Sequence, residues 1–103
     1  MTIQELTTEV EKVSVAYADH FEIKRDKNWF ILKLQEELGE LIQSYLMMSG
    51  QARVKNKTPE QLEADFKAEV ADVFCHVLLL AKHTDVELEA EIKQKWMSRI
   101  EKR

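Results

Sequence analysis

Two short acidic motifs contain the residues of this sequence that could best do chemistry. Residues 36–40 read EELGE, and residues 69–72 read EVAD. Positions three apart on a helix project from neighbouring turns towards one side, so Glu37 pairs with Glu40 and Glu69 with Asp72. Acids at this spacing are also common on solvated helix faces, which is the ordinary interpretation of either motif alone.

The surroundings of the second motif change this interpretation. Residues 70–81 read VADVFCHVLLLA, in which Asp72 and His76 are the polar interruptions. A helix that is apolar on all sides is typical of the interior of a bundle or an oligomer, so we predict that Asp72 is buried. Burying an ionised carboxylate is costly unless it is paired or binds a cation. A single lysine, Lys33 or Lys67, cannot balance four converging acids, whereas a divalent cation can.

A ligand set made only of oxygens favours a hard cation. Mg²⁺ takes one or two carboxylates together with waters and phosphates, and two pairs of acids on facing helices could bind one or two such ions. Gly39 within the first motif costs about 1 kcal/mol of helix stability relative to alanine. It either allows a helix or a ligand to approach the acids closely or is simply tolerated.

Four helices are predicted to position these acids. A capping box at Thr2 and Glu5 begins the first helix, which continues to about His20. The second runs from about Trp29 to Met48, with Asp26 or Asn28 as its cap and Ser49-Gly50 as its end. The third begins at Thr58-Pro59 and ends near His83, and a capping box at Thr84 and Glu87 begins the fourth, whose apolar side holds Leu88, Ile92, Trp96 and Ile100.

Short connections between these helices predict one compact, all-α, antiparallel four-helix bundle over residues 1–103. Opposite the acids, the second helix carries the apolar residues expected to face the core, namely Ile31, Leu34, Leu38, Leu41, Ile42 and Tyr45. The apolar third helix is difficult to cover with three short helices. We therefore expect a homodimer, or a tetramer built as a dimer of dimers, with the site near the interface.

Composition excludes some partners. The net charge of −4 argues against nucleic acid, which needs a basic footprint. Cys75 is the single cysteine, so no disulfide forms within the chain and a reducing compartment is expected. No signal-peptide pattern and no apolar stretch of membrane-spanning length is found, so no membrane partner and a soluble, cytoplasmic protein are expected.

The motifs EELGE and EVAD resemble those of the MazG-like nucleotide pyrophosphohydrolases, an all-α superfamily with the pattern Glu-Glu-x-x-Glu followed by Glu-x-x-Asp. The resemblance covers roughly residues 29–82. It implies a MazG fold and hydrolysis of nucleoside triphosphates to monophosphate and pyrophosphate, with Mg²⁺ or Mn²⁺ as cofactor and nucleotide-pool house-cleaning as the role. By position, the resemblance makes Glu37, Glu40, Glu69 and Asp72 the metal ligands. Glu36, with Glu37 the catalytic pair, would orient the attacking water or act as its general base.

Substrate-binding residues match the family pattern less closely. The candidates for phosphate binding are Lys33, Lys93, Lys95 and Arg99, with Arg53, Lys55 and Lys57 as alternatives. Trp29 lies on the acid-bearing side of its helix and either stacks on a base or packs in a core or dimer interface. His76 either hydrogen-bonds to a metal-bound carboxylate or, the commoner case, is a buried histidine satisfied elsewhere.

Two other functions also place acids on neighbouring helices. A di-iron carboxylate bundle requires Glu-x-x-His on two helices, and the residues three before His20, His76 and His83 are not glutamates. That class is excluded. The remaining rival is a non-catalytic helical interaction module with solvated acids. The base, the sugar and the number of metal ions are not specified by the sequence.

Overall fold

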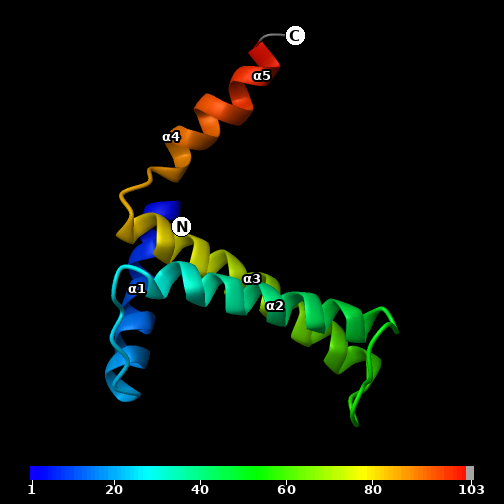
Figure 1. Cartoon of the computed structure of the whole chain (residues 1–103). Coiled ribbons are helices and arrows are strands. Elements are labelled where there is room, and N and C mark those ends of the chain that lie inside the picture. The colour runs from blue at the N-terminus through cyan, green and yellow to red at the C-terminus, as the bar shows by residue number, and fades with distance from the viewer. Residues whose placement is uncertain (102–103) are drawn as a thin grey trace.

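The computed structural model describes residues 1–101, which form helices and no strand (Figure 1). The helices are α1 (Ile3–His20), α2 (Trp29–Met48), α3 (Pro59–His83), α4 (Leu88–Ile92) and α5 (Ser98–Glu101), with a π-helical segment, η1 (Lys93–Met97), between the last two. The segments α4, η1 and α5 follow one another without a break and form one C-terminal helix. Within residues 1–101, no helix is long and apolar enough to cross a membrane.

The sequence signals for the first three helices are confirmed. Thr2 and Glu5 form the predicted capping box, and so do Thr58 and Gln61 at the start of α3. Gly50, just beyond α2, has a φ of 80°, which a glycine adopts without the strain of a Cβ.

Of the two alternative caps predicted for α2, the structure uses Asp26. At the start of α2, Asp26 Oδ1 accepts from the backbone N–H of Asn28 at 3.1 Å and of Trp29 at 3.0 Å, whereas the Asn28 side chain makes no cap. The predicted capping box at Thr84 and Glu87 is wrong. The Thr84 hydroxyl donates instead to the carbonyl of Leu80 at 2.7 Å, within the last turn of α3.

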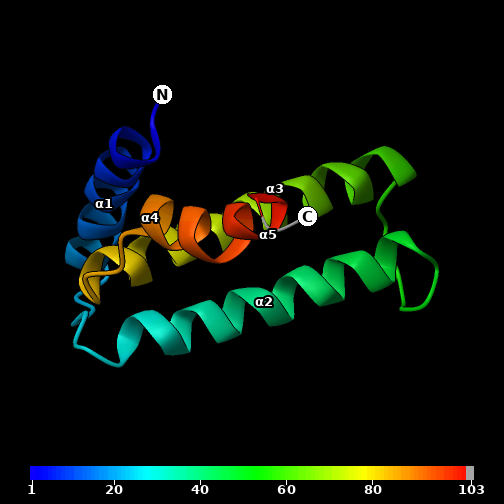
Figure 2. The same cartoon turned by 90° about the horizontal axis from the view of Figure 1, so that it is seen from above.

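The antiparallel hairpin of α2 and α3 is the main body of the molecule. Helix α1 crosses one end of it, near the start of α2 and the end of α3 (Figure 2). The C-terminal helix points away from the hairpin (Figure 1). The chain is therefore not the compact four-helix bundle that its short connections predict. Its radius of gyration is 16.6 Å, whereas a compact domain of this length has about 13 Å.

A small core forms where α1 crosses α3. Leu78 is fully buried and Leu79 and Phe30 nearly so, while α1 contributes two small buried residues, Ser14 and Ala18. Small side chains at a helix crossing let the two backbones approach closely. The crossing thus fixes the direction of α1 over the hairpin.

A polar network ties α1 to the rest of the fold. Arg25 Nη1 donates to Glu11 Oε1 at 2.6 Å and to the Ser14 hydroxyl at 3.1 Å. On α3, His83 Nε2 lies 3.0 Å from Glu11 Oε2, and its ring stacks on Phe30 with the centroids 4.0 Å apart. Burial opposes the ionisation of Glu11, but the bonds from Arg25 and His83 outweigh it and lower its pKa. The network therefore joins α1, the 21–28 connection and the end of α3.

Much of the predicted core of α2 is exposed. Ile31, Leu38, Ile42 and Tyr45 were expected to face the core, yet each is 45–52% exposed. The prediction fails because only the side of α2 that carries Phe30, Leu34 and Leu41 turns towards α3. At about 100° per residue, the exposed residues lie across the α2–α3 contact from the acids. They continue on α3 and form what we name the apolar face, consisting of Ile31, Leu38, Ile42, Tyr45, Val70 and Phe74.

Candidate metal centre

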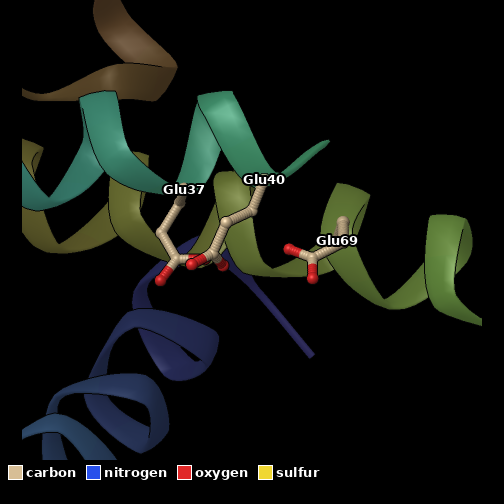
Figure 3. Close-up of side chains that lie close together, drawn as sticks. All are labelled: Glu37, Glu40 and Glu69. Carbon is tan, nitrogen blue, oxygen red and sulfur yellow. The ribbon is translucent and has the colours of Figure 1, made fainter. Parts of the chain in front are cut away.

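Three of the predicted metal ligands lie together. Glu37 and Glu40 project from α2, and Glu69 reaches towards them from α3 (Figure 3). One carboxylate oxygen of each lies within 4.8 Å of the others. Two oxygens on opposite sides of one Mg²⁺ are about 4.2 Å apart, since each Mg–O bond is about 2.1 Å. The spacing of the three carboxylates, which we name the acid cluster, therefore suits a single small cation.

Two oxygens of the acid cluster have no partner. Glu37 is 7% exposed, and its Oε2 is fully covered without a hydrogen bond to any residue of the described part of the chain. Glu69 Oε2 is in the same state. A buried acceptor without a partner costs about 1–3 kcal/mol, and more if it is charged. Native proteins rarely keep such groups, so these orphaned oxygens fit the ligand set of a divalent cation.

The carboxylates also oppose one another electrostatically. Burial raises the pKa of Glu37, and the nearby charge of Glu40 raises it further, against a smaller lowering effect of Lys33. Burial likewise raises the pKa of Glu69, with the charges of Asp72 and Glu40 adding to it. Both carboxyl groups therefore bind protons more readily than an exposed glutamate. A cation among them would relieve the same repulsion.

Among residues 1–101, Lys33 is the one lysine or arginine that forms an ion pair with the acid cluster. Its Nζ lies 3.3 Å from Glu36 Oε1 and 3.6 Å from Glu37 Oε1, and its side chain is 19% exposed. Burial alone would lower the pKa of Lys33, but the two glutamates outweigh this effect and raise it, so the ammonium stays charged. Within residues 1–101, Glu40 and Glu69 form no ion pair. One ammonium group thus faces several acids, as predicted.

The prediction that Asp72 is buried is wrong. It was expected to be buried within an apolar helix, but it is exposed and lies outside the acid cluster. The prediction fails because no other helix of the described chain covers this side of α3. Asp72 remains on the acid-bearing side, where its charge raises the pKa of Glu37 and Glu69.

A pocket of about 480 Å³ adjoins the acid cluster. Its walls come from three helices, with Val10, Val13 and Tyr17 on α1 and Trp29 on α2. Glu37, Lys33 and Asp72 line the same pocket where it opens to the acids. A cavity of this size and mixed character is typical of a small-molecule site. It could hold an aromatic group while the acids act on charged groups at its mouth.

His76 lies between the pocket and the acid cluster. Its Nε2 is 3.8 Å from Glu37 Oε1, too far for a hydrogen bond, and its ring centroid is 6.3 Å from that of Trp29. Its Nδ1 is buried with no partner among the described residues. Burial, and then the charge of Lys33, lower the pKa of His76, so the ring is neutral near pH 7. Within residues 1–101, neither ring nitrogen of His76 has a hydrogen-bond partner.

Most of the basic residues predicted to bind phosphate lie elsewhere. Lys93, Lys95 and Arg99 belong to the C-terminal helix, which leads away from the hairpin that carries the acids (Figure 1). Arg99 lies over the Trp96 ring, 5.1 Å from its centroid. In the 49–58 connection, Lys57 pairs with Asp65 at 2.6 Å, and Arg53 and Lys55 are exposed. Only Lys33 and Trp29 of the predicted substrate-binding residues reach the site.

The contribution of α1 to the site is not predicted from the sequence. An apolar stripe of α1 that includes Val10, Val13 and Tyr17 forms one wall of the pocket. One signal was present in the sequence. The small residues Ser14 and Ala18 lie four apart beside that stripe and mark the side by which α1 approaches α3.

The whole chain was also compared with known proteins. The comparison with protein-family models, curated proteins and solved structures found no match. The geometry of the site therefore carries the argument about function.

Proposed function

We propose that this protein is a magnesium-dependent nucleoside triphosphate pyrophosphohydrolase of MazG-like type, with Mn²⁺ able to replace Mg²⁺. The observation that carries the proposal is the acid cluster, in which glutamates from two helices converge and keep two buried oxygens without partners. Such a site suits a divalent cation. A divalent cation next to an apolar pocket suits a substrate with phosphates at one end and an aromatic base at the other.

The residues of the site divide into two groups. Glu37, Glu40 and Glu69 would hold the cation, with Asp72 at the pocket mouth as a further oxygen ligand or as an anchor for its waters. Trp29 and the α1 residues would enclose the nucleoside. When bound, Mg²⁺ supplies charge neutralisation on the phosphates and a lower pKa for the attacking water.

The reaction proposed is hydrolysis at the α-phosphorus. The oxygen of a water molecule attacks this phosphorus, and the bond to the oxygen that bridges to the β-phosphate breaks. The products are the nucleoside monophosphate and pyrophosphate. Glu36, whose side chain is 58% exposed beside the acid cluster, would orient the water and accept its proton.

The assembly proposed is a homodimer, or a tetramer built from it. The apolar face and the apolar side of the C-terminal helix leave large side chains exposed in the single chain. A contiguous surface of this kind is typical of a protein–protein interface. Because the apolar face lies opposite the acids, pairing of two hairpins through it would leave both acid clusters open to substrate.

A non-catalytic interaction module is the competing hypothesis. The exposed apolar face would serve such a module equally well. An interaction module would not need glutamates from two helices to meet at a partly buried site, where their repulsion lowers stability. The orphaned oxygens of Glu37 and Glu69 therefore favour the enzyme.

The test is a pyrophosphate-release assay across the common ribo- and deoxyribonucleoside triphosphates, with Mg²⁺ or Mn²⁺ added. We expect turnover that EDTA abolishes and that Glu40→Gln reduces by at least about a hundredfold, as loss of a metal ligand does. Glu63→Gln is the matched control, because Glu63 is an exposed glutamate on α3 paired with Lys67 at 3.1 Å. No turnover of any triphosphate by a folded protein that also shows no metal-induced stabilisation would favour the interaction module.

A further inference from the structure

Lys33 lies where its ammonium group can reach either the acid cluster or the pocket. Its Nζ is close to Glu36 and Glu37, and the side chain also lines the pocket next to Trp29 and Asp72. A lysine carries its charge on a flexible stem, so a small rotation moves the ammonium from one side to the other. The residue therefore stands at the boundary between the acid cluster and the pocket.

In the metal-free protein, Lys33 is the only lysine or arginine in the described chain that pairs with an acid of the cluster. It offsets part of the charge of Glu37, but it leaves Glu37 Oε2 and Glu69 Oε2 without partners. A divalent cation among Glu37, Glu40 and Glu69 would compensate all three carboxylates. It would also place two positive charges close to the Lys33 ammonium, and like charges at this range repel strongly.

A triphosphate at the pocket mouth would reverse this repulsion. Its negative charges would lie within reach of Lys33 on α2. The phosphate-binding candidates of the C-terminal helix, in contrast, lie on a segment that leads away from the site (Figure 1). Lysine is a common ligand of phosphate oxygens, acting as a point charge.

We propose that Lys33 is an exchangeable counter-ion, which pairs with Glu37 in the metal-free protein and moves to the substrate phosphates when a divalent cation enters the acid cluster. The inference rests on the proposed function and adds a residue that competes with the metal and cooperates with the substrate. Removing the charge of Lys33 should therefore affect the two ligands in opposite directions. A residue with a merely structural role would not produce this pattern.

The variant that tests the exchange is Lys33→Met, which keeps an unbranched side chain only one atom shorter and removes its charge. Isothermal titration of the metal-free protein with Mn²⁺ alone should show binding about tenfold tighter than in the wild type, because a competing cation is gone. In the hydrolysis assay at saturating metal, the KM for the preferred triphosphate should rise about tenfold, with a smaller change in kcat.

Two controls accompany this variant. Lys33→Arg keeps the charge and should bind Mn²⁺ like the wild type. Lys67→Met removes a lysine from an exposed pair with Glu63, outside the pocket, and should change neither quantity. Circular dichroism verifies that each variant is folded, and Lys33→Gln replaces Lys33→Met if the latter does not fold.

The outcomes separate the exchange from the function on which it rests. Equal or weaker Mn²⁺ binding by Lys33→Met, in a protein that binds metal and hydrolyses triphosphate, would overturn the exchange alone. Tighter Mn²⁺ binding with an unchanged KM would overturn the movement to the substrate. A wild-type protein that binds no Mn²⁺ would overturn both the exchange and the proposed function.

Discussion

Glu37 on α2 and Glu69 on α3 each keep one carboxylate oxygen fully covered and without a hydrogen bond to any residue in the range 1–101. Oxygens of the two side chains also lie within 4.8 Å of each other and of Glu40. Ionised carboxylates at this distance repel one another, and the pKa of both glutamates is raised by burial and by neighbouring acids. The proposed divalent cation would relieve this repulsion.

The cost of the acid cluster should be measurable in the metal-free protein. The pKa of Glu37 is raised in the folded protein, so ionisation of Glu37 destabilises the fold. The protein is free of this cost below the ordinary pKa of 4.5 and loses stability as the pH rises through the raised pKa. Glu37→Gln should therefore raise the free energy of unfolding at pH 7, because it removes an acid whose ionisation opposes folding. The gain should shrink as the pH falls through the raised pKa of Glu37.

Urea unfolding in EDTA at pH 7 and at a series of lower pH values measures this difference, with Glu63→Gln as the exposed control. Comparing the variant with the wild type at each pH cancels the titration of the histidines. A loss of stability at pH 7 would show that Glu37 is a structural partner of Lys33 instead of a destabilising acid.

Replacing Asp72 should weaken metal binding without changing the stability of the metal-free protein. Because it is exposed, Asp72→Ala should change the free energy of unfolding of the metal-free protein by no more than about 0.5 kcal/mol. Its charge acts on Glu37 and Glu69, so metal affinity should fall, by about tenfold. Thermal unfolding with and without Mn²⁺ measures both effects. Unchanged metal affinity would remove Asp72 from the site.

Gly39 tests whether anything packs against the side of α2 on which it lies. A Cβ at this position would meet no heavy atom of the described chain within 4 Å, which excludes a close approach of another helix of the same chain. Gly39→Ala should therefore stabilise the metal-free protein by up to about 1 kcal/mol, as expected from helix propensity. A loss of stability or of dimerisation in this variant would show that a second chain packs against Gly39.

The apolar face should control the oligomeric state. Ile42→Glu and Phe74→Glu each place a charge on the apolar face and should convert a dimer to monomers at micromolar concentration in sedimentation experiments. Leu32→Glu is the control, because Leu32 is 61% exposed but lies outside the apolar face. If the wild-type protein is a monomer, or if all three variants dissociate equally, the proposed interface is wrong.

Local signals predicted the helices and the acid cluster well. The bounds of α2, Trp29–Met48, agree with the sequence because the residues on either side carry strong signals, namely Asp26 before it and Ser49-Gly50 after it. Glu37, Glu40 and Glu69 meet because i, i+3 spacing fixes the side of each helix on which they lie. These features depend on neighbours along the chain.

The failures concern what covers a helix. The apolar run around Asp72 predicts burial, and the stripe with Ile31 and Leu38 predicts a core, yet all three residues are exposed in the single chain. Hydrophobic periodicity shows that a surface needs a partner. It does not show whether that partner is the same chain, a second copy or a ligand. For the same reason the sequence does not predict the pocket, because its α1 wall depends on the angle at which α1 crosses α3.

The central claim is that acids from α2 and α3 hold the same divalent cation. Isothermal titration of the metal-free protein with Mg²⁺ and Mn²⁺, comparing the wild type with Glu40→Gln on α2 and Glu69→Gln on α3, tests it most directly. We expect saturable binding to the wild type and at least about tenfold weaker binding to each variant, since each loses one ligand of one site. Absence of binding to the folded wild type, or loss of affinity in only one of the two variants, would contradict the claim.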